Sequence, residues 1–533
     1  MCVNAHPGGP ALHLNLFRTK SVDMILGESR EEGHKLNRVL GPFDVTMIGI
    51  GAIIGAGIFT MIGEAAVGAK SGFPAGPSLI ISFVLTAIAC GFTAFCYAEL
   101  AAMVPISGSA YTYAYATMGE LIAWIIGWDL IIEYAIGNVA VAISWSGYFN
   151  DLLKTVFGWD IPIWLRIDYR SFLQKATEAK EALAAAAAGL DPAALTELAE
   201  RARLFDLAAV PHLAGIPIIF NLPAVAIIMF LTAILIVGIK ESTRFNDVMV
   251  VIKLLVLAVF IGVGLYYFKW EHWAPFAPGG WKGVQVGAAT IFFAYIGFDA
   301  VSTVAEETKE PARDMPLGIL GSLAVCTLLY ILVTIALTGM VPYMELRHKI
   351  AEPLIVGLEY NHVSNWLIGL VALGSVIAQT AVLLVFQLGQ PRIFFAMSRD
   401  GLLPPHFCKV HPRFGTPHIT TFWTGVVVAT LSAFCNLDEM ANLCNIGTLF
   451  AFVLVCAGVI ILRYTDPDRH RPFRVPGGIV LPVCGILFCV FLMGGLDWVT
   501  WVRFFLWLAV GIVIYMLYGR KHSRLNAAGK VPA

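Results

Sequence analysis

Ionisable side chains inside long apolar stretches are the residues of this chain best suited to chemistry. Lys253 lies within the apolar run 250–255, and Glu133 lies within 130–134, one helical turn after Asp129. Charges inside membrane spans are rare and usually functional. Because desolvation disfavours the charged form of a side chain, Lys253 or Glu133 could exchange a proton. Lys253 could instead extend to the lipid headgroups, for which Glu133 is too deep.

Two glycine interruptions in apolar runs indicate a site built from backbone groups. The stretch 49–59 reads GIGAIIGAGIF, and Gly297 interrupts the bulky run 292–298. Glycines cost a helix interior roughly 0.5–1 kcal/mol each relative to alanine. They could serve close helix packing, as we expect for Gly51. Interrupted spans in corresponding halves of a chain instead indicate unwound helices around a midplane site, as we expect at 55–57.

An unwound span offers two kinds of backbone polar group to a ligand. The N-terminus of a half-helix presents free N–H groups and a positive dipole end, which suit a carboxylate. Unwound carbonyl groups suit an ammonium group. A zwitterion such as an amino acid fits both halves of the site.

The elements that must position these groups are membrane spans. Of 533 residues, 58% are hydrophobic and 13% are charged, whereas soluble domains carry about 25% charged residues. Apolar runs of about 20 residues recur between residues 43 and 519, which predicts an all-α polytopic membrane protein with about twelve spans. The expected spans are 43–68, 76–104, 121–153, 218–238, 247–268, 285–304, 317–341, 365–391, 418–435, 441–462, 478–496 and 499–518.

The two interruptions predict two inverted repeats of five spans each. Lys and Arg concentrate on the loops that are cytoplasmic if both termini are inside, which predicts that orientation. The expected organisation is a cytoplasmic tail at 1–42, a first repeat at 43–268, a second repeat at 285–462, two further spans at 478–518 and a cytoplasmic tail at 519–533.

Residues 168–205 lie in a connection that is much longer than the others between the expected spans. They are rich in strong helix formers around a turn at 189–192, which predicts an extracytoplasmic helical hairpin. The insertion is either a solvated spacer or a docking site for a partner. Residues 1–40 lack the apolar region of a cleaved signal peptide, and the ten cysteines lack metal-ligand spacing.

Several motifs resemble those of the amino acid–polyamine–cation permeases, specifically the bacterial branch similar to cationic amino acid transporters. The resemblance runs from about Leu16 to Arg520 and is interrupted mainly by the insertion. It implies the 5+5 inverted-repeat transporter fold with broken first and sixth spans. Besides 49–59 and Lys253, the matching motifs are CYAEL at 96–100, PISGSAYTY at 105–113, GWDLIIEY at 127–134, ESTRFN at 241–246, YIGFD at 295–299, MSRDGLLP at 397–404 and RPFRVP at 471–476.

The resemblance also implies roles for particular residues. Backbone amides of 55–57 would bind the substrate α-carboxylate, and carbonyls of 294–297 would receive the α-ammonium. Gln379 would contact the substrate side chain. The implied substrate-binding residues are Ile54, Gly55, Ala56, Gly57, Phe292, Ala294, Tyr295, Gly297 and Gln379, and the implied gate residues are Phe292, Phe293 and Phe298.

Proton coupling is the other property that the resemblance implies. Lys253 stands where sodium-coupled relatives of the same fold hold sodium, so a proton is the expected coupling ion, with Glu133 assisting. Some permeases of this branch have threonine where this chain has Ala56, which leaves the coupling route open.

The predicted function is proton-coupled symport of L-amino acids across the cytoplasmic (inner) membrane. An amino acid exchanger and a membrane amino acid sensor are the alternatives. No GxSxG, HExxH or Walker motif supports an enzyme or an ATP-driven pump. We expect an amino acid, protons and membrane lipids as partners, and no cofactor, metal or nucleic acid. The sequence does not reveal whether a small accessory subunit binds. Because Gln379 is neutral, neutral substrates such as alanine are favoured over cationic ones.

Overall fold

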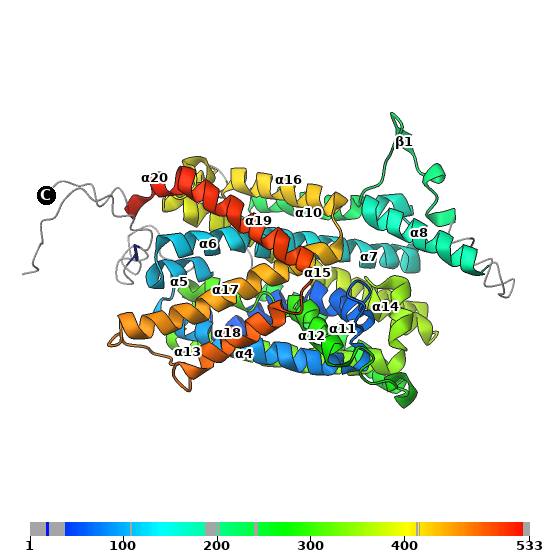
Figure 1. Ribbon diagram of the computed structural model, residues 1–533, viewed down its shortest axis with the longest axis horizontal. Coiled ribbons are helices and arrows are strands. Elements are labelled where there is room, and N and C mark those ends of the chain that lie inside the picture. Colours follow the sequence, from blue (N-terminus) through cyan, green and yellow to red (C-terminus); the bar gives the residue numbers. More distant parts are fainter. Residues whose placement is uncertain are drawn as a thin grey trace, which may run out of the picture.

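The computed structural model describes residues 18–20, 38–106, 109–186, 199, 203–238, 243–411, 414 and 416–525. Within these residues the only sheet is a small antiparallel pair, β1 (His212–Leu213) and β2 (Ile216–Pro217). Most of the long helices run roughly along the long axis of the molecule (Figure 1). The all-α fold predicted from composition is confirmed.

The first predicted span is a bent pair of helices. α2 (Pro42–Ile53) ends three residues before Ala56, and the chain continues as η1 (Gly57–Met61), a π-helical turn, and α3 (Ile62–Val67). The two parts are bent by 42°. The helix therefore breaks where the glycine pattern predicts an interruption.

The remaining helices of the first half follow without a second break of this kind in the described residues. They are η2 (Gly76–Ser78), α4 (Leu79–Met103), α5 (Ser109–Thr117), α6 (Glu120–Ile131), η3 (Ile132–Ile136), α7 (Gly137–Phe157), η4 (Ile163–Leu165), α8 (Tyr169–Ala186), η5 (Leu207–Ala209), α10 (Leu222–Val237) and α11 (Thr243–Tyr266).

The second half begins with the other interrupted span. α12 (Gly280–Ile291) tightens into η7 (Phe292–Ala294), turns through Gly297 and continues as η8 (Asp299–Glu307). The later elements are α13 (Pro311–Met340), η9 (Tyr343–Lys349), α14 (Pro353–Tyr360), α15 (Asn365–Arg399), η10 (Pro405–Cys408), α16 (His418–Phe434), α17 (Leu437–Thr465), α18 (Val480–Met493), α19 (Trp498–Ile514), η11 (Tyr515–Gly519) and α20 (Arg520–His522).

Every predicted span coincides with a helix or a helix pair. Among the described residues, eight helices are long and apolar enough to cross a membrane, and the bent pair adds one more. α10, α16 and α18 are apolar but only 16, 17 and 14 residues long. The count of twelve crossings and the orientation of the termini therefore stay predictions.

Small residues let the buried helices approach closely. A Cβ atom added to Gly318 of α13 would lie 2.2 Å from the Val45 side chain of α2. One added to Gly264 of α11 would lie 2.6 Å from Ala336 of α13. Close backbone approach of this kind is how helices associate where lipid removes most of the hydrophobic driving force.

The insertion has a small core of its own. Phe172 of α8 packs with Val210 and Ile219, and its ring meets that of Phe205 edge to face. The turn expected at 189–192 and most of the second expected helix lie outside the described residues. α8 and β1 lie at the opposite end of the molecule from α20 (Figure 1), and we call this the insertion end.

Candidate substrate and proton site

The two helix breaks cross each other at the centre of the site. A Cβ atom on Gly57 would lie 2.1 Å from the Cα atom of Ala294, and one on Gly297 would lie 2.7 Å from the carbonyl oxygen of Ala52. Gly297 also has φ +113°, a conformation that L side chains rarely adopt. These two glycines are therefore required by close contact between segments far apart in the sequence.

The first break exposes backbone groups to the protein interior. Ile54 leaves the helix with φ −76° and ψ 98°, and the four residues 54–57 are buried. Gly55 faces Val382 of α15, whereas Gly51, still inside α2, packs against Asn246 and Val250 of α11. Gly51 thus serves helix packing, as the sequence predicts.

Lys253 binds the end of the helix at this break. Its ammonium nitrogen donates to the carbonyl oxygens of Gly51 at 2.6 Å and Ile54 at 3.1 Å, and its side chain is fully buried. The last carbonyls of a helix lack internal partners and carry the negative end of the helix dipole. A cation satisfies both, so the alternative that Lys253 reaches the lipid headgroups is wrong.

Tyr330 joins the two breaks, and the sequence analysis missed it. Its hydroxyl group lies 3.0 Å from the carbonyl oxygen of Ile53 and 2.8 Å from that of Ala294, and its single hydrogen is shared between these two acceptors. Tyr330 belongs to α13, in an otherwise apolar run. The one available signal was that a buried tyrosine usually finds a partner for its hydroxyl group.

Aromatic rings gather beside the second break. Phe292 and Phe298 contact Phe452 of α17 with ring centroids 5.7 and 5.0 Å apart, and Phe298 also meets Tyr97. Among the described residues, no ring contact joins Phe293 to this group. Of the three gate candidates, the structure thus brings two together.

Tyr295 points away from the crossing of the breaks. Its hydroxyl group donates to the carbonyl oxygen of Phe83 of α4 at 3.2 Å, and its ring stacks edge to face on Tyr330. This hydroxyl group is thus already engaged with the scaffold. Any contact of Tyr295 with substrate would involve its backbone or ring.

Buried carboxyl groups lie near the second break. Glu133 occupies η3, a π-helical turn of a kind frequent at functional sites. Asp299 and Thr448 lie beside its side chain. The oxygens of Asp129 have no hydrogen-bond partner within the described residues. Because a charged carboxylate is costly at this depth, these groups are candidates for a functional role.

Gln379 has a buried amide group without a partner. Neither its side-chain nitrogen nor its oxygen forms a hydrogen bond within the described residues. It lies on α15 three residues before Val382, and residues so spaced share one helix face. Since Val382 contacts Gly55, this face is directed at the first break. An unpaired buried amide there is suited to binding a polar ligand group.

Comparisons with known proteins agree with this architecture. A family model described as "Amino acid permease" matches residues 40–518. The chain is 46% identical to the branched-chain amino acid permease BcaP of Bacillus subtilis and 44% identical to the methylthioribose transporter of the same organism; each match covers 96% of this chain and 99% of the relative.

A eukaryotic relative extends the comparison. Cationic amino acid transporter 2, vacuolar, of Arabidopsis thaliana is 37% identical over 86% of this chain and 64% of its own length. These relatives are permeases and transporters, and the helices of this chain are apolar enough to cross a membrane. The chain is an integral membrane protein that belongs to the amino acid permease family of the amino acid–polyamine–cation superfamily.

Proposed function

We propose that this permease carries L-amino acids across the cytoplasmic membrane by proton-coupled symport with alternating access. The observation that carries the proposal is the buried Lys253 ammonium bound to Gly51 and Ile54 at the first helix break. When this nitrogen is protonated, it is the cation that binds the carbonyl oxygens at the end of α2. Loss of that proton weakens both contacts, so proton binding biases the arrangement of α2 against α11.

The substrate would lie between the two breaks. In this proposal, residues 54–57 bind the α-carboxylate through backbone amides, and residues 294–297 bind the α-ammonium through carbonyls. The crossing of Gly57 and Ala294 supports this, because it brings the two sets of groups within reach of one small molecule. Gln379 would face the substrate side chain, and Phe292 and Phe298 would close over it with Phe452.

A neutral side chain fits these residues best. Val382 and the neutral Gln379 share the face of α15 that is directed at the first break, and one relative is named for branched-chain amino acids. The buried carboxyl groups of Asp129 and Glu133 support the alternative, a cationic side chain, if they carry charge when substrate binds. The methylthioribose transporter adds a candidate that is not an amino acid.

A competition assay discriminates these substrates. Purified protein in proteoliposomes would take up radiolabelled leucine against each of the twenty amino acids and methylthioribose at fixed pH. Stronger competition by alanine, valine or isoleucine than by arginine and lysine supports a neutral site. Strong competition by arginine and lysine would assign the buried carboxyl groups to substrate binding. Absence of leucine uptake, together with uptake of radiolabelled methylthioribose, would overturn the amino acid assignment.

Symport and exchange differ in their need for internal substrate. A symporter accumulates amino acid in empty liposomes when the outside is acidic, whereas an exchanger needs liposomes preloaded with amino acid. Uptake that requires preloading and ignores the pH gradient would replace symport by exchange. Binding without any flux in either format would support the sensor.

A further inference from the structure

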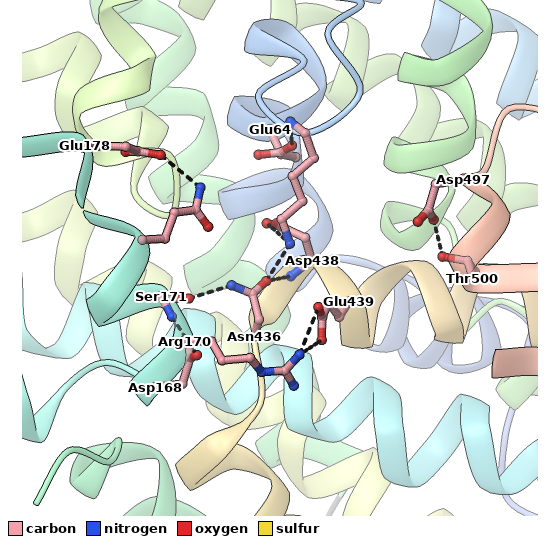
Figure 2. Close-up of polar contacts among 12 residues, drawn as sticks. Glu64, Asp168, Arg170, Ser171, Glu178, Asn436, Asp438, Glu439, Asp497 and Thr500 are labelled. Carbon is pink, nitrogen blue, oxygen red and sulfur yellow. Dashed lines mark hydrogen bonds and ion pairs between the residues drawn. The ribbon is translucent and has the colours of Figure 1, made fainter. Parts of the chain in front are cut away.

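Polar side chains join four segments at the insertion end of the bundle. They come from α8, the loop after α3, the start of α17 and the start of α19. Figure 2 shows Asn436 at the centre of this group, with Ser171 on one side and Asp438 on the other. None of these residues belongs to the site described above, and the sequence leaves open whether the insertion is a spacer or a docking site.

The Asn436 side chain forms hydrogen bonds with α17, with Lys70 and with the insertion. It caps α17, because its Oδ1 atom accepts from the backbone N–H of Asp438 at 3.0 Å. The same oxygen accepts from the Lys70 ammonium at 2.9 Å. Its Nδ2 atom donates to the Ser171 hydroxyl oxygen at 2.6 Å. One amide group thus connects the bundle to the insertion.

Lys70 connects the broken first span to α17. α3 ends at Gly68 with φ +60°, and the backbone N–H of Lys70 then donates back to the Glu64 carboxylate at 3.3 Å. The Lys70 ammonium also lies 3.1 Å from an oxygen of Asp438. The part of the first span that follows the break, η1 and α3, therefore cannot move away from α17 without breaking the contacts of Lys70 to Asn436 and Asp438.

The insertion contacts the same end of α17 at a second point. Arg170 pairs with Glu439 at 3.3 Å, and Arg503 of α19 pairs with the same carboxylate at 3.2 Å. Ser171 is held by its backbone N–H, which donates to Asp168 at 2.9 Å. The first turn of α8 is thus fixed to the first turn of α17 at two points, Asn436 and Glu439.

We propose that Lys70 and Asn436 are positioning residues for transport, and that the first turn of α8, which carries Arg170 and Ser171, is a strap that holds them in the closed arrangement. This inference rests on the proposed alternating access. In the proposed opening, η1 and α3 move away from the start of α17, and this movement breaks the contacts of Lys70 to Asn436 and Asp438. Ser171 keeps the Asn436 amide turned toward Lys70, so the insertion favours closure without contacting substrate.

Thiol labelling tests the strap without any substrate. Thr60 lies in η1, fully buried, and its hydroxyl group contacts Ser144 and donates to the carbonyl oxygen of Ala351. In a background with Cys2 and the partly exposed cysteines 408, 435 and 484 changed to alanine, Thr60→Cys in nanodiscs reports opening through its rate of reaction with a charged maleimide. Val67→Cys of α3 is the second reporter, should Thr60→Cys not fold.

Lys70→Met and Asn436→Ala are expected to raise the labelling rate roughly two- to fivefold, the range for a partly exposed ion pair. Ser171→Ala is expected to raise it in the same direction, and Lys70→Arg to restore the original rate. Glu178→Ala is the matched control, because its partner Gln174 lies in α8 itself. Thr500→Ala is the control in α19, where its contact is with Asp497.

Uptake kinetics provide a second readout. More frequent opening should lower the KM for external leucine and lower the maximal rate, because closure becomes less favourable. Unchanged labelling in Lys70→Met and Asn436→Ala would overturn the proposal, as would equal acceleration in Glu178→Ala. Faster labelling in a protein that proves to be an exchanger or a sensor would leave the strap standing and overturn only the proton-coupled symport.

Discussion

Removing the Tyr330 hydroxyl group probes how the two helix breaks are held together. Tyr330→Phe keeps the ring and deletes the donor that serves the carbonyl oxygens of Ile53 and Ala294. Leaving a buried acceptor without its donor costs about 1–3 kcal/mol. At 25 °C this corresponds to about a 5- to 150-fold change in an equilibrium constant.

We expect this cost to appear in substrate affinity. In Tyr330→Phe no hydroxyl group joins the two helix breaks, so the substrate must order both segments when it binds. The dissociation constant for substrate should therefore rise about 5- to 150-fold. The assay is equilibrium binding of the preferred substrate from the competition experiment to purified protein. Thermal unfolding of the same samples separates lost affinity from lost structure.

Tyr295→Phe is the matched control. It deletes a buried hydroxyl group from an adjacent ring, but that group donates to Phe83 of α4 and not to either break. It should lower the unfolding temperature and leave the dissociation constant within about twofold of wild type. Wild-type affinity in Tyr330→Phe, or an equal loss in Tyr295→Phe, would refute the reasoning.

Two further predictions concern the glycine crossing and the loop before α14. Gly57→Ala should abolish uptake, because its methyl group would lie 2.1 Å from Ala294, whereas Gly91→Ala should keep wild-type uptake, because no atom lies within 4 Å of the added carbon. Burial and the nearby Asp151 raise the pKa of Glu352 from 4.5 to about 7. Protonated Glu352 is therefore favoured in the folded protein, and the stability it contributes is lost as pH rises from about 4.5 to about 7. The unfolding temperature should fall over that window in wild type and fall less in Glu352→Gln, and an identical pH dependence in both would contradict this assignment.

Local composition was enough to predict the part of the site that the backbone forms. Glycines at 55, 57 and 297 stand out in apolar runs because they weaken the helices that contain them, and the structure breaks the chain at both places. Lys253 stands out for a similar reason, since a lysine is costly in a span. These signals depend on residue type alone.

The contacts between helices could not be predicted in this way. Tyr330 and Phe452 are ordinary residues of apolar helices, and their roles depend on which helix faces they share with the breaks. Asn436 reads as a simple helix cap, yet its contacts with Lys70 and Ser171 span 366 and 265 residues of sequence. The periodicity of a single sequence does not specify which side chains of distant helices contact each other.

Simultaneous measurement of amino acid and proton uptake tests proton coupling through Lys253 most directly. The experiment compares wild type with Lys253→Met in proteoliposomes under an imposed pH gradient, acidic outside, with Lys282→Met as the exposed-lysine control. Wild type and Lys282→Met should accumulate amino acid together with protons, and Lys253→Met should lose both gradient-driven accumulation and proton flux. Accumulation in Lys253→Met that still follows the pH gradient would contradict the account.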